Sequence, residues 1–308
     1  MEKPTLCISS SIMGGLGNQL FQVFATIAYG IKHNRKIIFP ENITVQSKYP
    51  RHTYWDSFLK HLFIFTTKFP ANKITQDMLF AYPIYQEGQG FSYVAIPEFK
   101  NTNVRLHGYF QSYKYFDKYE ANILNLIKLN NIRDGVLTKY GDQYLRDKTV
   151  PTVSMHFRLG DYKILPDYHP VLSYVYYVHA LQYLLGKIGE KFRVLIFCDK
   201  EDMDTVKGYV DNHFLTRISA ELEYIYVESD MEDWEEMVLM SACDHHIIAN
   251  STFSWWGAYL AGSQNKEKIV CYPDVWFGME YMNQNTKDLF PERWTRIDAG
   301  MPHLRYWT

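Results

Sequence analysis

Short apolar runs alternate with helical patterns along the second half of the chain. Five runs rich in apolar or β-branched residues are predicted to be strands, at 152–157, 193–198, 223–227, 246–250 and 268–272. Helical patterns separate most of them, at 171–188, 202–209, 231–243 and 254–261. Because strands that alternate with helices form parallel sheets, we expect ligands to bind at the carboxyl ends of these strands.

The first half opens with the same kind of pattern and then loses it. Residues 5–13 are predicted to be a strand, 14–17 a glycine turn, 18–33 a helix and 37–39 a second strand. From 51 to 116 the pattern dissolves into short aromatic-rich pieces, and 120–148 resembles a polar helical connection. The prediction is an α/β protein with two Rossmann-like domains, 1–130 and 131–308, that face each other across a cleft.

Composition agrees with a globular protein and disfavours two other classes. The chain has 308 residues, of which 47% are hydrophobic and 21% charged, enough to bury a large core. A net charge of −2 without a long run of Lys or Arg argues against a nucleic-acid partner. No uninterrupted apolar stretch reaches the ~20 residues that cross a bilayer, so no transmembrane segment is predicted.

Two further features bear on the compartment. The four cysteines are scattered without C-x-x-C spacing, so we expect reduced thiols in the core. An Asn-x-Thr sequon at Asn250 falls inside the most informative motif, where a glycan would be incompatible with ligand binding. We expect a cytoplasmic or soluble protein, with peripheral attachment to a membrane left open.

The first segment with chemical content is Gly-Gly-Leu-Gly-Asn-Gln-Leu-Phe at 14–21. It fails as a dinucleotide fingerprint, because the third glycine of G-x-G-x-x-G would fall at Leu20. Gly15 and Gly17 still permit close approach of the backbone to a ligand. Asn18 and Gln19 are predicted to open a helix, where free N–H groups favour a negative ligand. An ordinary strand–helix turn with an Asn cap is an equal alternative.

The second segment is Ser-Met-His-Phe-Arg-Leu-Gly-Asp-Tyr at 154–162. His156 and Arg158 alternate at a strand end, so their side chains point to the same face. The planar guanidinium of Arg158 suits a diphosphate leaving group, and Asp161 is predicted to fix either the arginine or the loop. The alternative is a surface Arg–Asp ion pair.

The third segment, 236–257, predicts a helix, a buried strand, the sequence Asn-Ser-Thr-Phe-Ser at 250–254, and another helix. Hydroxyl groups and exposed N–H groups at a helix start can bind a pyrophosphate without a metal. The alternative is a helix N-cap followed by a Trp pair that packs in the core. His245 and His246 are adjacent rather than i, i+4, which disfavours a metal site and favours core or supporting histidines.

Together these segments resemble the α-1,2-fucosyltransferase family, glycosyltransferase family 11. The resemblance covers nearly the whole chain, through G-G-L-G-N-Q at 14–19, G-Y-F-Q-S-Y-K-Y-F at 108–116, H-x-R-x-G-D-Y at 156–162, Tyr176-Tyr177, F-C-D at 197–199 and the run 243–260. It departs at Leu159, where members commonly have a second Arg, and at Glu236, where Asp is common. These departures bear on activity and on selectivity for the base of the donor.

The resemblance implies a GT-B architecture, with the nucleotide bound mainly by the C-terminal half, and a metal-independent inverting transfer of fucose from GDP-fucose to a glycan. GDP-fucose is then a substrate, and no cofactor is expected. The implied catalytic residues are Arg158, Asn18 and Asp161. The implied donor-binding residues are Gly15, Gly17, His156, Asp199, Glu236, Asn250, Ser251, Thr252 and Phe253. Tyr109 and Gln111, in the aromatic-rich middle, are the predicted acceptor-binding residues.

Three alternatives stay open at this point. A transferase of the same fold would use another GDP-sugar or form another linkage, which Leu159 and Glu236 permit. An inactive protein that binds glycans or nucleotides would keep the phosphate-binding groups without turnover. An NAD-dependent oxidoreductase is the least favoured, because Leu20 breaks the fingerprint.

Overall fold

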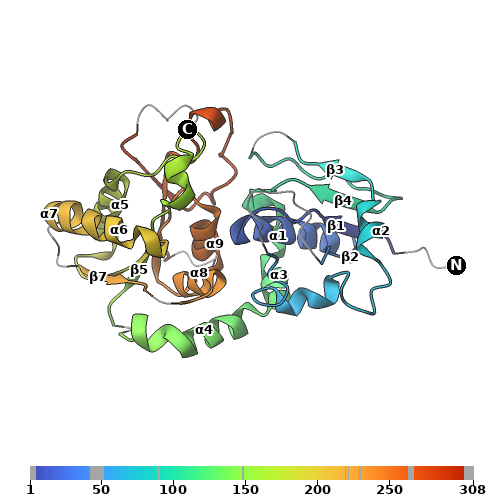
Figure 1. The fold of residues 1–308 in the computed structure, drawn as a ribbon, viewed down its shortest axis with the longest axis horizontal. Helices are drawn as coiled ribbons and strands as arrows, with labels where there is room; N and C mark the ends of the chain where they lie inside the picture. Colours follow the sequence, from blue (N-terminus) through green and yellow to red (C-terminus); the bar gives the residue numbers. More distant parts are fainter. Residues whose placement is uncertain are drawn as a thin grey trace. The chain divides into compact units, whose positions relative to one another are not determined.

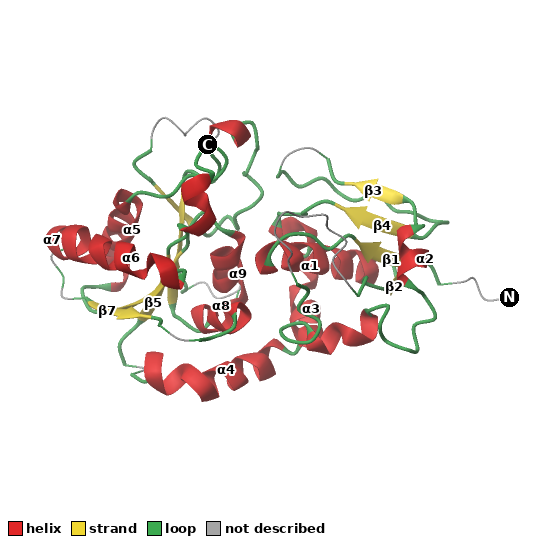
Figure 2. Cartoon of the chain, in the orientation of Figure 1, coloured by secondary structure: helices red, strands yellow, loops and turns green. Residues whose placement is uncertain are grey.

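The computed structural model describes residues 5–41, 52–88, 91–147, 149–218, 220, 222–228, 230–262 and 267–301. The chain packs as two compact units (Figure 1). Unit 1 runs to Ile132 and takes in Asn285–Phe290, whereas unit 2 comprises Arg133–Gln284 and the residues from Pro291 onward. Each unit holds a sheet with helices, which confirms the predicted α/β class with two Rossmann-like regions (Figure 2). The facing cleft and the division into donor and acceptor domains stay predictions.

Unit 1 contains a four-stranded parallel sheet in the order β2-β1-β4-β3. Its strands are β1 (Cys7–Ser10), β2 (Lys36–Ile37), β3 (Ile84–Gln86) and β4 (Val104–His107). Its helices are α1 (Leu16–Lys32), α2 (Gln76–Phe80) and α3 (Glu120–Ile127), and α4 (Leu129–Tyr144) follows. The predicted strand–turn–helix–strand opening is confirmed, whereas β3 and β4 lie in the aromatic-rich middle for which no element was predicted.

Unit 2 contains a six-stranded parallel sheet in the order β10-β9-β8-β5-β6-β7. Its strands are β5 (Thr152–His156), β6 (Arg193–Phe197), β7 (Glu223–Tyr226), β8 (His245–Ile247), β9 (Val270–Pro273) and β10 (Thr295–Ile297). Its helices are α5 (Tyr174–Ile188), α6 (Met203–Tyr209), α7 (Leu215–Arg217), α8 (Asp233–Ser241) and α9 (Thr252–Leu260). All five strands predicted in this half are present, and β10 is an additional one.

The centre of the second sheet explains why these strands form. Every residue of β5 and β6 is buried, as expected for strands covered on both faces by helices. In the register of the sheet, Met155 of β5 pairs with Ile247 of β8, and His156 pairs with Phe197 of β6. The residues that follow these three strands therefore leave the sheet at one edge.

Burial and helix length bear on two expectations from the sequence. All four cysteines are buried free thiols, which confirms the expectation of core cysteines. Among the helices in the described part of the chain, none combines the length and apolar character needed to cross a bilayer.

Helices α8 and α9 approach each other closely at a glycine. A Cβ atom at Gly257 would lie 2.4 Å from Sδ and 2.9 Å from Cγ of Met240 on α8. The neighbouring Trp255 and Trp256 are fully buried, with their ring centroids 5.1 Å apart in an edge-to-face arrangement. The predicted role of this Trp pair in core packing is thus observed.

Gly257→Ala is expected to destabilise the protein by about 1–3 kcal/mol, because the added methyl group overpacks the contact with Met240. Gly135→Ala is the matched control, since a Cβ there meets nothing within 4 Å and α4 gains helix propensity of up to about 1 kcal/mol. The measurement is urea unfolding of both variants. Equal stability of the two variants would contradict the close contact between Gly257 of α9 and Met240 of α8.

Candidate functional site

Arg158 lies just beyond β5 and is held by three groups. Its Nη2 atom lies 2.6 Å from Oδ1 of Asp161 and its Nη1 atom 3.1 Å from Oδ2 of Asp199. The guanidinium also lies over the Tyr162 ring, 5.4 Å from its centroid. The ion pair expected by the alternative interpretation therefore exists, together with a second carboxylate. A quarter of the Arg158 side chain remains exposed, so the fork is oriented and accessible.

Tyr162 connects the Arg158 segment to the segment that follows β8. Its hydroxyl donates to the Asn250 carbonyl oxygen at 3.0 Å. Next to this bond, the rings of His156 and Phe253 lie with centroids 5.5 Å apart. The structure thus brings the two predicted donor-binding segments of unit 2 together at one edge of the sheet. Sequence reasoning missed Tyr162 as a site residue, although an aromatic ring four positions after an arginine in the same motif was a usable signal.

The hydroxyl-rich segment forms the start of α9, two residues earlier than predicted. Ser251 is the N-cap, and its Oγ atom accepts the N–H of Phe253 at 3.3 Å. Ser254 accepts the Ala249 N–H at 3.2 Å and so joins the helix to the strand end. The N-cap alternative is therefore observed for Ser251. The Ser251 cap binds one N–H group, whereas the first turn of a helix has four N–H groups without a partner in the helix. The start of α9 therefore keeps the positive end of the helix dipole at this edge of the sheet.

Two buried side chains beside this segment keep an unpaired polar atom. Nδ1 of His156 has no hydrogen-bond partner among the described residues, and burial, followed by the charge of Arg158, lowers the pKa of this histidine to about 3. Asn250 donates its amide to the carbonyl oxygens of Pro170 and Trp276, but its Oδ1 atom has no partner in the described part of the chain. Buried polar groups rarely stay unpaired, so a neutral His156 is suited to meet a ligand.

Glu236 on α8 and Asp199 beyond β6 form the acidic side of this edge. Burial, followed by the charges of Asp199 and Asp233, raises the pKa of Glu236 to about 7. Asp199 also lies against Gly160, where a Cβ atom would come within 2.6 Å of its Oδ2 atom. The charge of Asp199 therefore acts on Glu236, and Asp199 also forms an ion pair with Arg158.

The turn that carries Arg158 and Asp161 is fixed by a residue that the sequence did not single out. Buried Asp202 accepts the Gly160 N–H at 2.7 Å and pairs with Lys163. Its only sequence signal is a carboxylate at the start of the helical pattern at 202–209.

Unit 1 contains the glycine segment. Gly14 has φ +77°, a left-handed conformation that favours glycine, and α1 begins with Gly15 as an N-cap that uses no side chain. Asn18 is the third residue of the helix, so the Asn cap of the alternative interpretation is wrong, and the helix begins two residues earlier than predicted. A Cβ atom at Gly15 would meet nothing within 4 Å, which leaves its backbone open, whereas Gly17 is buried in the first turn.

Buried glutamines hold this segment in place. Gln22 accepts the Met13 N–H at 2.9 Å and donates to the Met13 carbonyl at 2.8 Å, while Gln19 donates to the Gly14 carbonyl at 3.0 Å. Gln111 donates its amide to Oδ1 of Asn18 at 2.9 Å. Two residues that were predicted separately, one catalytic and one acceptor-binding, are thus in direct contact. Tyr109, beside Gln111, is 39% exposed.

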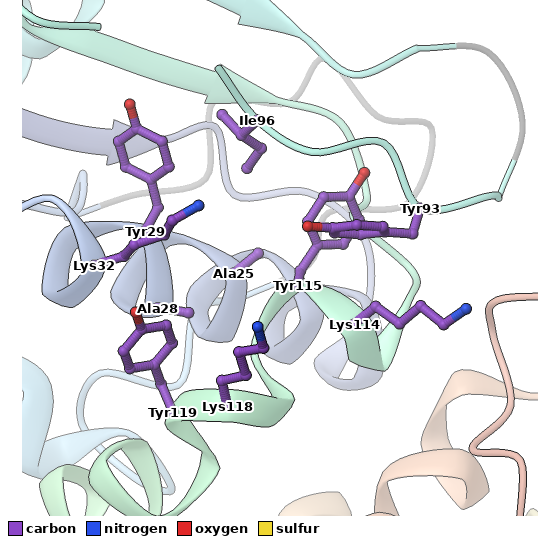
Figure 3. A pocket seen from close by; sticks show the side chains of 10 residues that line it. All are labelled: Ala25, Ala28, Tyr29, Lys32, Tyr93, Ile96, Lys114, Tyr115, Lys118 and Tyr119. Atoms are coloured by element: carbon purple, nitrogen blue, oxygen red, sulfur yellow. The ribbon is translucent and has the colours of Figure 1, made fainter. Parts of the chain in front are cut away.

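A separate pocket of about 170 Å³ lies in unit 1 (Figure 3). It is lined mainly by tyrosines and lysines, namely Ala25, Ala28, Tyr29, Lys32, Tyr93, Ile96, Lys114, Tyr115, Lys118 and Tyr119. Lys114 forms an ion pair with Asp288 at 2.5 Å. The pocket contains none of the predicted site residues and is smaller than the ~300–1,000 Å³ of typical ligand sites, so we do not assign a substrate to it.

No group of three or more His, Cys, Asp or Glu side chains arranged to hold a metal ion occurs within the described ranges. The adjacent histidines are both buried, and His246 shares a 2.7 Å hydrogen bond with Ser154. They are core residues, as predicted. Metal independence of the reaction stays a prediction.

Comparison with known proteins identifies relatives. The family model described as glycosyl transferase family 11 matches residues 51–298. An Escherichia coli α-1,2-colitosyltransferase is 27% identical over 94% of this chain and 99% of its own length. A Caenorhabditis elegans galactoside 2-α-L-fucosyltransferase is 25% identical over 92% and 77%.

An O-antigen biosynthesis glycosyltransferase of Escherichia coli, WbnK, is 31% identical over 59% of this chain. The match spans 58% of that relative's length. Among solved structures, POFUT1 in complex with GDP-fucose has a TM-score of 0.48 and 12% identity over 88% of this chain and 98% of its own.

The raised pKa of Glu236 predicts a pH-dependent contribution to stability. A carboxyl whose folded pKa lies near 7 favours folding while protonated, and this contribution is lost as pH rises from the unfolded value of about 4.5 through about 7. Glu236→Gln removes this titration. The stability of wild type is therefore expected to fall relative to that of the variant as pH rises from 5 to 8. Urea unfolding at both pH values measures this fall, with the exposed Glu223→Gln as control. An equal pH response of wild type and Glu236→Gln would contradict the prediction.

Proposed function

The chain belongs to glycosyl transferase family 11, and on that premise we propose that it transfers L-fucose from GDP-fucose to a hydroxyl of a galactose-containing glycan. The proposed linkage is α-1,2, formed with inversion at the anomeric carbon. The names of two relatives that cover most of the chain support this proposal, since one is an α-1,2-colitosyltransferase and the other a galactoside 2-α-L-fucosyltransferase.

The observation that carries the proposal is the convergence of Arg158, His156 and the start of α9 at one sheet edge. A guanidinium and the positive end of a helix both favour a diphosphate, and a neutral imidazole adds a hydrogen-bonding group. We assign the diphosphate of the donor to this edge, with Ser251, Thr252 and Phe253 next to it.

The proposed reaction is a single displacement. An acceptor hydroxyl oxygen forms a bond to the anomeric carbon while the bond from that carbon to the phosphate oxygen breaks, and the proton of the hydroxyl is released to solvent. GDP leaves from the opposite face, and negative charge grows on its β-phosphate. Arg158 is oriented by Asp161 and Asp199 before the reaction, so it stabilises this charge without reorganising.

Unit 1 supplies the residues proposed for the reacting end. Gly15 leaves its backbone open, and Asn18 has its amide oxygen fixed by Gln111. An amide cannot take the proton of the acceptor, so we assign Asn18 a binding and orienting role. Tyr109 is exposed beside Gln111, which fits the proposed contact with the glycan.

A second candidate is the same chemistry with colitose in place of fucose. It is favoured by the Escherichia coli colitosyltransferase, whose match covers 99% of its length. Glu236 and Leu159 are compatible with either donor. A binding protein without turnover is the remaining alternative.

Arg158→Ala is expected to lower kcat by ~10²–10³, because one preorganised group that stabilises the leaving charge is lost. Arg158→Lys keeps the charge but not the planar fork and should recover only part of the rate. The exposed Arg293→Ala serves as a control for loss of a surface charge. Release of GDP from GDP-fucose, with a β-galactoside acceptor, is the measurement.

The same assay separates the candidates. Faster release from GDP-linked colitose than from GDP-fucose would support the second candidate, and NMR of the product gives the linkage. Binding of both donors without turnover would support the binding protein. Near-normal turnover by Arg158→Ala would rule out the assigned diphosphate site.

A further inference from the structure

Glu87 follows β3 at the carboxyl edge of the sheet in unit 1 and binds the turn that follows β4. Its Oε2 atom accepts the Phe110 N–H at 2.7 Å, and its own N–H donates to the His107 carbonyl at 2.8 Å. The Tyr115 hydroxyl lies 3.4 Å from its Oε1 atom. One partly buried carboxylate therefore joins the ends of two neighbouring strands.

The turn at 108–111 has a backbone that needs such support. Gly108 has φ +153° and Phe110 has φ +52°. A left-handed conformation is unfavourable for a residue with a side chain, and it persists only where surrounding contacts impose it. The fully buried Phe110 ring is one such contact and the Glu87 carboxylate is the other. A Cβ atom at Gly108 would lie 2.3 Å from Cβ of Glu87, so a residue with a side chain at position 108 would clash with Glu87.

This turn leads directly to the proposed site. Gln111 follows Phe110, and its side-chain amide donates to Oδ1 of Asn18 at 2.9 Å. Tyr109, on the other side of Phe110, is exposed. The backbone conformation at Phe110 therefore sets the directions of Tyr109 and Gln111, and through Gln111 the orientation of the Asn18 amide.

We propose that Glu87 is a positioning residue for glycosyl transfer, which holds the 108–111 turn through the Phe110 N–H and thereby orients Tyr109, Gln111 and Asn18. The inference rests on the proposed function of these three residues. It adds a carboxylate that belongs to none of the motifs in the sequence. Glu87 acts through the turn and not on the reacting atoms.

The charge of Glu87 should affect how firmly the turn is held. Burial outweighs the hydrogen bonds from Phe110, Tyr109 and Tyr115, which lower the pKa of Glu87, so that this pKa is raised to about 7. Because the folded pKa lies above the unfolded value of about 4.5, the protonated form favours the closed turn, and the turn is held less firmly as pH rises through about 7. The titratable groups that face Glu87 are Tyr85 on β3 and Tyr115 after β4.

The test compares Glu87→Ala, Glu87→Gln and the control Glu98→Gln, an exposed glutamate in the same unit. Glu87→Ala leaves the N–H groups of the turn without their acceptor and is expected to lower kcat about 10- to 100-fold by misplacing the site. The KM for the GDP-sugar should change little, because the assigned diphosphate site lies in unit 2. Glu87→Gln keeps an acceptor oxygen and should recover most of kcat at pH 7.

Two readouts separate positioning from a general loss of structure. Wild-type kcat/KM for the acceptor should fall as pH rises above about 7, because ionised Glu87 holds the turn less firmly, and Glu87→Gln should lack this fall. Amide hydrogen exchange at Phe110 and Gln111 should accelerate in Glu87→Ala, with the rest of unit 1 unchanged. If Glu87→Ala does not fold, the pH profile and exchange of Glu87→Gln decide. After correction for intrinsic rates, exchange at 108–111 should accelerate in wild type as pH rises through 7 and should not do so in Glu87→Gln.

Wild-type kcat and unchanged exchange at 108–111 in Glu87→Ala would overturn the inference. The same holds if Glu87→Gln reproduces the wild-type pH profiles of both activity and exchange. If wild type turns over no donor, the proposed function fails, and exchange at Phe110 alone then decides whether Glu87 holds the turn.

Discussion

The parallel pairing of β5 with β8 is the constraint on which the proposed donor site depends. Met155 of β5 lies opposite Ile247 of β8, and both side chains are buried in the core of unit 2. With that register, Arg158 and Ser251 leave the sheet at the same edge. The hydrogen bond from Tyr162 to Asn250 then joins the two segments.

The charges at this edge of the sheet explain how the Arg158 guanidinium can be held in one orientation and still bind a negative ligand. Arg158 binds Asp161 through Nη2 and Asp199 through Nη1, and its guanidinium has further N–H groups that can bind a diphosphate while both carboxylates keep it oriented. Because Glu236 is buried and near Asp199, its pKa of about 7 keeps it largely protonated below pH 7, and it then adds little negative charge to this edge. Donor binding should therefore cost less where Glu236 is neutral, which connects the acidic side of the site to the affinity for a negative ligand.

The sequence predicted those features that depend on local pattern. The strands of unit 2 were predicted because each is a compact apolar run, and the position of Arg158 at the end of one of them followed from alternation along the strand. By contrast, β3 has no buried residue and β10 has one among three, so no apolar run marks either strand. The glycine N-cap of α1 was missed because an Asn in the first turn resembles a cap.

Contacts between distant parts of the chain were beyond sequence reasoning. Gln111 and Asn18 are 93 residues apart, and only the fold shows that one amide orients the other. Tyr162 and Asp202 were likewise not predicted as site residues, because their roles arise from hydrogen bonds to the backbone at Asn250 and Gly160. A backbone acceptor or donor has no residue identity, so no motif records such a partner.

The distribution of carboxylates suggests where catalysis is concentrated. In unit 2, Asp161 and Asp199 pair with Arg158, and Asp202 pairs with Lys163, so each is committed to orienting a cation or a turn. In unit 1, Glu87 is committed to the turn at Phe110. An arrangement of this kind uses its charges for preorganisation, and in such sites the rate is raised mainly by stabilisation of developing charge rather than by proton transfer. The chemistry proposed for this protein accordingly depends more on the departure of GDP than on activation of the acceptor hydroxyl.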